Sequence, residues 1–218
     1  MNKKKVDLGK QSIIKSICQA SKDYRDNLMG KSFLLLYEGQ SIEIIFKKEN
    51  FLHLCGVETH LYAEDFFNKA LKGTLKYKEI HFSHQHPFRL CEPKLQNISN
   101  TFKSLKNEFL VLTDVKTPSR NYKIGIMSND TVFCFNTGLI KNMLVPYSLR
   151  IGKIAPDKYK QAIKIDYVLS KITHTKYYNK VEFGDKDTLN QYLDKYNITL
   201  PNQSVEDNEI DFDRDLDR

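Results

Sequence analysis

The chain has 218 residues, a length that fits one domain of ordinary size, and 40% of them are hydrophobic, including 13 Phe and 12 Tyr. No stretch approaches the roughly 20 apolar residues of a membrane-spanning helix, and no apolar core of signal-peptide length follows the basic N-terminus. We therefore expect a cytoplasmic protein with no membrane partner. Four separated cysteines without a Cys-x-x-Cys pair predict reduced, buried thiols, with a disulfide as the alternative.

The net charge of +7 is unevenly distributed along the chain. Residues 205–218 contain seven acidic residues and two arginines, a net charge of −5, which leaves +12 for the preceding 204 residues. A basic body indicates a polyanion-binding domain, although excess lysine can also serve solubility alone. We predict a single domain over residues 1–200 and an acidic, disordered tail over residues 201–218 that folds back over the basic body.

The first half of the chain indicates a helix, a hairpin and further helices. Apolar residues on one face predict a helix over residues 6–28, and β-rich runs at 31–37 and 41–46 predict a hairpin. A helix over residues 62–72 should end at Gly73, and residues 76–82 are predicted to form a short helix. Pro93 fits the first turn of another helix that extends to about Lys106.

The second half is rich in β-type residues. Strands are predicted at residues 109–113, 122–127, 131–135, 163–169 and 177–183, and a closing helix at residues 187–196. Because helices come first and an antiparallel meander follows, the order indicates an α+β domain instead of βαβ units.

Standard motifs for nucleotide binding, zinc proteases and serine hydrolases are absent from the sequence. The run His81-Phe-Ser-His84-Gln-His86 contains three metal-type ligands, but apart from Cys91 no partner carboxylate or thiolate lies at motif spacing. A polar loop is the better interpretation. We therefore expect no metal and no cofactor.

Residues 47–57 are the stretch around which the rest of the chain is organised. They follow the predicted hairpin, precede the predicted helix at 62–72, and contain Lys47, Lys48, His53 and Gly56. This order places His53 at the end of a strand, where a side chain can project into a cleft and transfer protons. The alternative is a buried structural histidine that bonds to a backbone carbonyl.

An ordered series of residues extends this stretch over most of the chain, and it resembles the PBECR4 family, the phage-encoded barnase–EndoU–colicin E5/D–RelE-like nuclease domains. The residues that carry the resemblance are Tyr24, Gly30-Lys31, Lys48, Asn50-Phe51, His53-Leu54, Gly56, Phe66-Phe67, Arg89 to Lys94-Leu95, Pro146-x-Ser148-Leu149, Val168-Leu169-Ser170-Lys171 and Tyr177-Tyr178. Cys55 and Phe67 stand where the family suggests threonine and tyrosine, so neither position is given a hydroxyl role. The resemblance implies helices packed on a small, curved antiparallel sheet whose open face binds RNA.

Metal-independent RNA cleavage needs a base for the ribose 2′-OH, an acid for the departing 5′ oxygen, and positive charge for the phosphorane. The candidate catalytic residues are His53, Lys171, Ser148 and Tyr178, with His174 as an alternative acid or base. The candidate RNA-binding residues are Lys47, Lys48, Arg89, Lys94, Arg150 and Tyr177. Each also has a structural interpretation, as solvated surface charge, a turn cap or a core aromatic ring.

The sequence thus predicts a metal-independent endoribonuclease, a toxin or phage-conflict effector, with RNA as substrate and an antitoxin or immunity protein as partner. The alternative is a module without catalytic activity that binds RNA, or inhibits a protein, through the same basic face. The residue inventory leaves open whether the chain is an enzyme.

Overall fold

The computed structural model describes residues 3–84, 86–100, 109–117, 120–128, 131–137 and 143–200. The helices are α1 (Lys3–Asn27), α2 (Asn50–Cys55), α3 (Ala63–Lys72), α4 (Phe88–Asn100) and α5 (Leu189–Tyr196), with 3₁₀ turns at Tyr77–Glu79, Pro156–Lys158 and Lys186–Thr188. The strands are β1 (Lys31–Tyr37), β2 (Gln40–Ile45), β3 (Glu58–Thr59), β4 (Ile80–His81), β5 (Phe109–Lys116), β6 (Asn121–Ser128), β7 (Thr131–Thr137), β8 (Leu144–Ile151), β9 (Gln161–Lys164), β10 (Tyr167–Ile172) and β11 (Lys180–Phe183).

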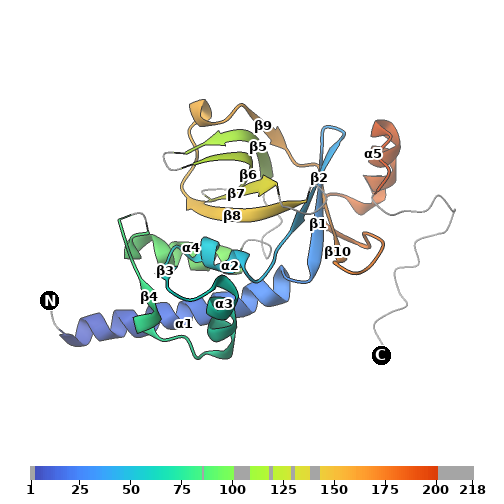
Figure 1. Cartoon of the computed structure of the whole chain (residues 1–218). Coiled ribbons are helices and arrows are strands. Elements are labelled where there is room, and N and C mark those ends of the chain that lie inside the picture. Colours follow the sequence, from blue (N-terminus) through green and yellow to red (C-terminus); the bar gives the residue numbers. More distant parts are fainter. Residues whose placement is uncertain are drawn as a thin grey trace, which may run out of the picture.

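One large sheet dominates the molecule. Its nine strands follow the order β11-β10-β1-β2-β8-β7-β6-β5-β9, and β3 and β4 form a separate pair. All neighbours in the large sheet are antiparallel except β2 and β8, which pair in parallel only at Ile44 and Leu144. Figure 1 shows strands β5–β9 curled into a half-barrel above a lobe formed by α1–α4, with β1, β2 and β10 to one side. The α+β class is confirmed and the sheet is curved, whereas the expectation of a small sheet is wrong.

The main core lies between the helical lobe and the sheet. Tyr24 of α1 is fully buried, its ring lies 5.3 Å from Phe51 and 6.0 Å from Phe67, and its hydroxyl donates to the Lys47 carbonyl at 2.8 Å. Tyr24 therefore fixes the backbone immediately before α2 to the long helix. A second core cluster, which contains Leu34, Leu36 and Leu169, covers the other face of β1 and β10.

Long periodic elements follow the sequence predictions closely. The helix predicted at residues 6–28 is α1, the predicted hairpin is β1–β2, and α3 ends at Gly73 with a positive φ of 70°. The three strands predicted between residues 109 and 135 are β5, β6 and β7. The closing helix is α5, which begins at Leu189 after a 3₁₀ turn.

Several local predictions are wrong. His53 lies within α2 and not at a strand end. The helix predicted at residues 76–82 is a 3₁₀ turn followed by β4, and the strand predicted at 163–169 is divided between β9 and β10. Pro93 lies inside α4 and not in its first turn, and the predicted end of this helix near Lys106 falls outside the described residues, as does the tail at residues 201–218.

The cysteines Cys18, Cys55, Cys91 and Cys134 are all free thiols, and all except Cys18 are buried. Within the described ranges, no helix combines the length and the apolar character needed to cross a bilayer.

Candidate active-site cleft

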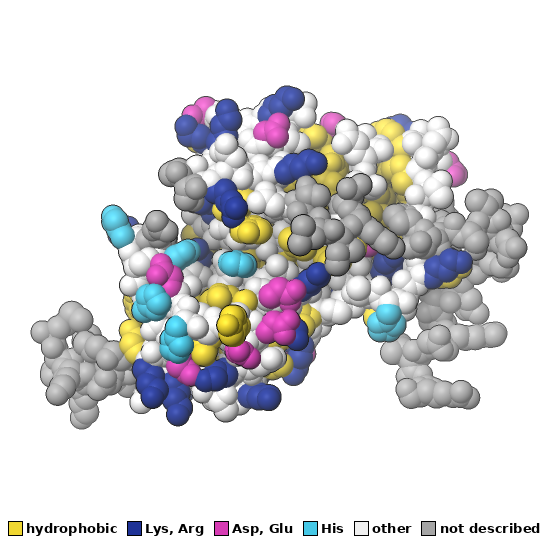
Figure 2. Space-filling view, viewed as in Figure 1, with side chains coloured by type: hydrophobic (Ala, Val, Ile, Leu, Met, Phe, Trp, Pro, Cys, Tyr) yellow, Lys and Arg dark blue, Asp and Glu magenta, His cyan; other side chains and the backbone are white. Residues whose placement is uncertain are grey.

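A cleft of about 1330 Å³ separates the helical lobe from the curled strands. Its lining comes from α2, the β3–β4 pair and the start of α4 on one side, and from β5, β6, β8 and the segment after β8 on the other. On the face shown in Figure 2, histidine side chains gather over the helical lobe, and Lys and Arg side chains lie above them over the curled strands. The cleft therefore brings segments from both halves of the chain together.

His53 reaches this cleft because of the way α2 is buried. Phe51, Leu54 and Cys55 are fully buried on the core side of this short helix, so His53 lies on the opposite side and lines the cleft. Gly56 ends α2 in the left-handed conformation, with a φ of 72°. His53 is exposed on its cleft side, but partial burial still lowers its pKa below its usual value, and the charges of Arg120 and of protonated His86 lower it further.

Tyr147 meets His53 from the sheet side. The register of β7 and β8 shifts so that Cys134 pairs with Ser148 and Phe135 pairs with Pro146, which leaves Tyr147 as the extra residue of a bulge. The Tyr147 ring stacks on the His53 imidazole with centroids 5.4 Å apart and planes 8° apart. The bulge therefore directs an aromatic side chain out of the ladder and onto the histidine.

Arg120 lies beside this stack, and Arg150 is linked to the Arg120 segment through Thr117. The Arg120 guanidinium carbon is 4.5 Å from the Tyr147 ring centre. The Arg120 backbone is held in the β5–β6 connection, where its N–H donates to the Thr117 hydroxyl at 3.2 Å and its carbonyl accepts from the Thr117 N–H at 3.1 Å. Arg150 of β8 donates from Nη2 to the same hydroxyl at 3.0 Å. Thr117 thus joins the connection to β8.

Lys94 of α4 extends across Gly56 into the cleft. A Cβ atom at Gly56 would lie 2.8 Å from Lys94 Cδ and 3.2 Å from Lys94 Nζ, so a larger residue there would displace the lysine side chain from this path. Burial, followed by the nearby Arg150 guanidinium, lowers the pKa of the Lys94 ammonium. The two cations therefore repel one another, and an anion bound between them would relieve that repulsion.

The β3–β4 pair carries the second group of histidines. Glu58 pairs with His81 at 3.0 Å and accepts a hydrogen bond from the Ser83 hydroxyl, which in turn accepts from the backbone N–H of His86 at 3.2 Å. Burial and Lys94 lower the pKa of His86, and Glu58 opposes them. His86 is therefore a second titratable group in the cleft.

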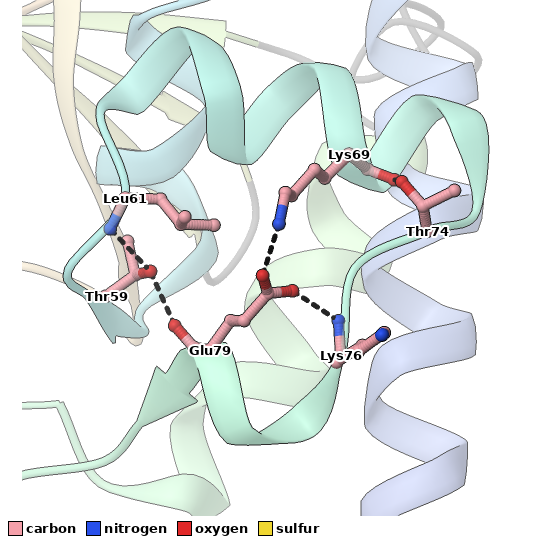
Figure 3. A network of polar contacts seen from close by, with 6 residues as sticks. All are labelled: Thr59, Leu61, Lys69, Thr74, Lys76 and Glu79. Atoms are coloured by element: carbon pink, nitrogen blue, oxygen red, sulfur yellow. Dashed lines mark hydrogen bonds and ion pairs between the residues drawn. The ribbon is translucent and has the colours of Figure 1, made fainter.

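A polar network links the β3–β4 pair to helix α3 (Figure 3). Thr59 donates to the Glu79 carbonyl at 2.5 Å and accepts from the Leu61 N–H at 3.2 Å. The Glu79 carboxylate accepts from the Lys76 N–H at 2.8 Å and forms an ion pair with Lys69 of α3. The network joins β3, the 3₁₀ turn and α3, so it holds Glu58 and His81 at the cleft.

The charge lining the cleft is strongly positive. Six lysine and arginine residues are present, with Glu58 as the single carboxylate among the described lining residues. The six are Lys94, Lys116, Arg120, Arg150, Lys153 and Lys158. Such a lining favours a polyanion over a neutral or cationic ligand.

The structure brings four of the candidate catalytic and RNA-binding residues into this cleft, namely His53, Lys94, Ser148 and Arg150. The other candidates, Lys47, Lys48, Arg89, Lys171, His174, Tyr177 and Tyr178, are not among the described residues that line it. Lys48 instead forms an ion pair with Glu64 at 2.6 Å. The charges that lower the pKa of His53 are those of Arg120 and His86, and not those of Lys47 and Lys48.

Lys171 and Tyr178 form a separate cluster around Glu43. The Tyr178 hydroxyl donates to Glu43 at 2.7 Å, and Lys171 Nζ lies 3.9 Å from the same carboxylate oxygen and 4.6 Å from the Tyr178 ring centre. Tyr178 belongs to the second core cluster, whereas Phe51 and Leu54 of α2 belong to the main core on the other face. Lys171 and Tyr178 therefore lie on the face of the sheet away from the core on which α2 packs, and neither is among the described residues that line the cleft.

Sequence reasoning missed Arg120, Tyr147 and His86. Arg120 follows turn-type residues between two strands, and Tyr147 is the variable position of the Pro146-x-Ser148-Leu149 motif. His86 was noticed only as one of three closely spaced histidines. Proximity to Pro146 was the one available signal for a bulge, because proline in a strand interior is confined to such irregularities or to edges.

The family model described as phage-Barnase-EndoU-ColicinE5/D-RelE like nuclease4 (PBECR4) matches residues 16–187, well over half of the chain. No curated protein matches, and no solved structure does either. The matched segment includes α2, the β3–β4 pair, α4, and strands β5 to β8, and so every described element that lines the cleft.

Proposed function

Because the chain belongs to the PBECR4 family of nuclease-like domains, we propose that it is a metal-independent endoribonuclease whose active site is the cleft around His53. The observation that carries this proposal is a histidine with a lowered pKa in a cleft lined by six lysine and arginine residues and one carboxylate. A neutral imidazole accepts protons near pH 7, and the cations attract the phosphates of the substrate.

In the proposed reaction His53 takes the proton of the ribose 2′-OH. The 2′ oxygen then attacks phosphorus, the bond to the 5′ oxygen breaks, and the departing oxygen receives a proton. The products are a 2′,3′-cyclic phosphate and a 5′-OH end, and no other reactant is consumed. His86 lines the same cleft and is the candidate for the second proton transfer.

The negative charge that develops on the phosphorane is assigned to Lys94 and Arg150. Both are partly buried, and each lies close enough to affect the other electrostatically. Ser148, next to the Tyr147 bulge, is a hydrogen-bond donor in the cleft. Cations that are already in place stabilise charge in the transition state without reorganisation.

We assign the protein a role as an effector in conflicts between phages and their hosts, acting on cytoplasmic RNA. Its partner would be an antitoxin or immunity protein with an acidic surface that fits the basic cleft. Charge complementarity supports an acidic partner, and the family description supports the phage setting.

The test is cleavage of a defined labelled RNA in excess EDTA, with analysis of the ends formed. Wild-type protein should leave 2′,3′-cyclic phosphate ends, and His53→Ala should reduce the rate by roughly 10²–10⁴-fold. His60→Ala, which removes an exposed histidine outside the cleft, is the matched control and should cleave at the wild-type rate. RNA binding without cleavage by the wild type would instead support the non-catalytic alternative.

A further inference from the structure

We propose that Tyr147 is a positioning residue for His53, which it holds in one orientation by ring stacking while Arg120 holds Tyr147 from the β5–β6 connection. This inference rests on the proposed function, in which His53 is the general base. The residue acts through His53 and has no assigned role at the phosphate.

Helix α2 alone does not determine the plane of the His53 ring. The helix fixes the histidine Cα, but the outer torsion of a histidine side chain has broad minima, so the imidazole could adopt several planes. The Tyr147 ring lies 8° from parallel to the imidazole and supplies the missing constraint. A base that must approach one ribose hydroxyl needs that constraint, because a small misplacement sharply reduces the rate.

The stack is anchored at both ends by rigid parts of the fold. His53 belongs to a helix whose neighbours Phe51 and Leu54 are fully buried, and Tyr147 lies at a bulge between paired residues of β7 and β8. Arg120 adds a third element, because its backbone is bonded to Thr117. The three side chains therefore connect the two walls of the cleft.

Tyr147 itself is 37% exposed and belongs to no core cluster, so packing of the core does not explain its position. An aromatic ring that is directed out of a strand by a bulge and placed on a histidine is more economically explained by a role at that histidine.

We expect the same stack to contribute to the lowered pKa of His53. Burial is its largest cause, and the Tyr147 ring covers one face of the imidazole. Arg120 and His86 are the charges that act on His53 most strongly, while Lys94, Arg150 and the carboxylate of Glu58 also line the cleft. Removing the ring should therefore raise the pKa towards the ordinary value of 6.5.

The experiment compares Tyr147→Leu, which keeps bulk but removes the ring, with Tyr147→Phe, which restores the ring without the hydroxyl. The His53 pKa is measured by NMR titration of the full chain, and kcat and KM are measured as functions of pH. In Tyr147→Leu we expect the pKa and the acidic limb of the rate profile to move up together, kcat to fall by about tenfold or more, and KM to change little. Tyr147→Phe should rescue both quantities.

An unchanged His53 pKa and acidic limb in Tyr147→Leu would overturn the proposal, as would a failure of Tyr147→Phe to rescue them. The NMR titration does not depend on turnover. If the wild type cleaves no RNA, the proposed function fails, and the shift in the His53 pKa between the two variants still decides the positioning role. The His86 pKa, followed in the same spectra, provides an internal control for a general change of the cleft.

Discussion

Gly56 and Gly73 offer a matched test of the position assigned to Lys94. Both glycines end a helix in the left-handed conformation, with φ values of 72° and 70°. A Cβ atom at Gly73 would have no neighbour within 4 Å, whereas one at Gly56 would lie 2.8 Å from Lys94 Cδ. An alanine in the left-handed region costs roughly 1–2 kcal/mol at either site. Because a lysine side chain can move aside, the two variants should lose similar free energies of unfolding.

RNA affinity should separate the two variants. Gly56→Ala displaces Lys94, and losing one charge-assisted phosphate contact of about 1.5 kcal/mol weakens binding by about tenfold. The slope of log affinity against log salt should become smaller by about 0.7, the value for one contact with a single strand. Binding is measured by fluorescence anisotropy in a His53→Ala background, so that the RNA stays intact, and unfolding is followed in urea. Equal affinities for the two variants would show that Lys94 makes no phosphate contact from this position.

Four further outcomes are expected. Cys55 is fully buried, its thiol donates a hydrogen bond to the Phe51 carbonyl at 3.2 Å, and burial raises its pKa. Native protein near pH 7 should therefore resist thiol labelling at Cys55, and rapid modification there would contradict this. Lys171→Met should lower the free energy of unfolding by about 1–3 kcal/mol, because it leaves the Glu43 carboxylate without its lysine partner. Cleavage by the folded fraction should stay nearly unchanged, since Lys171 is not among the described residues that line the cleft. Lost cleavage at unchanged stability would instead place the active site at Lys171. A chain ending at Ser204 should bind RNA more tightly than the full chain at low salt but equally well above about 0.15 M, and equal affinities at low salt would refute a shielding role for the tail. Because the folded state lowers the pKa of His53 below 6.5, the unfolded chain binds more protons there, and stability should fall as the pH drops through 6.5. The difference in free energy of unfolding between wild type and His53→Gln should therefore vary with pH over that window. A difference that stays constant with pH would contradict the lowered pKa.

Regular elements were predictable because their period extends over several turns or residue pairs. The buried face of α1, with Ile13, Ile17 and Tyr24, repeats at helical spacing, and β5–β7 are runs of β-type residues separated by turn-type residues. Helix α2 has only six residues, too few for a helical period to be distinguished from a strand. Strand β8 was missed because it contains Pro146, which is tolerated there by the bulge.

Half of the candidate site follows from sequence for a different reason. His53, Lys94 and Ser148 lie in segments that carry the family resemblance, and Arg150 follows one of them, so the resemblance and the residue types together suggested binding or catalysis. Arg120 and Tyr147 acquire their positions only from the β5–β6 connection and from the shift in β-sheet register. No local pattern reports such long-range placement, because it depends on which strands become neighbours.

Lys171 shows how the alternation of side chains along a strand decides whether a residue can reach the cleft or only stabilises the sheet. In β10, Val168 belongs to the main core on the side of α2, and Leu169 belongs to the second cluster on the other face. Lys171 lies two residues after Leu169 and therefore shares its face, where it meets Glu43. In the observed register Lys171 lies opposite Ser32. A shift of β10 by one residue would move the Lys171 side chain to the other face of the sheet. Motif order along the chain cannot distinguish the two cases. Register can, and it separates the Lys171 cluster, which stabilises the sheet, from the cleft around His53.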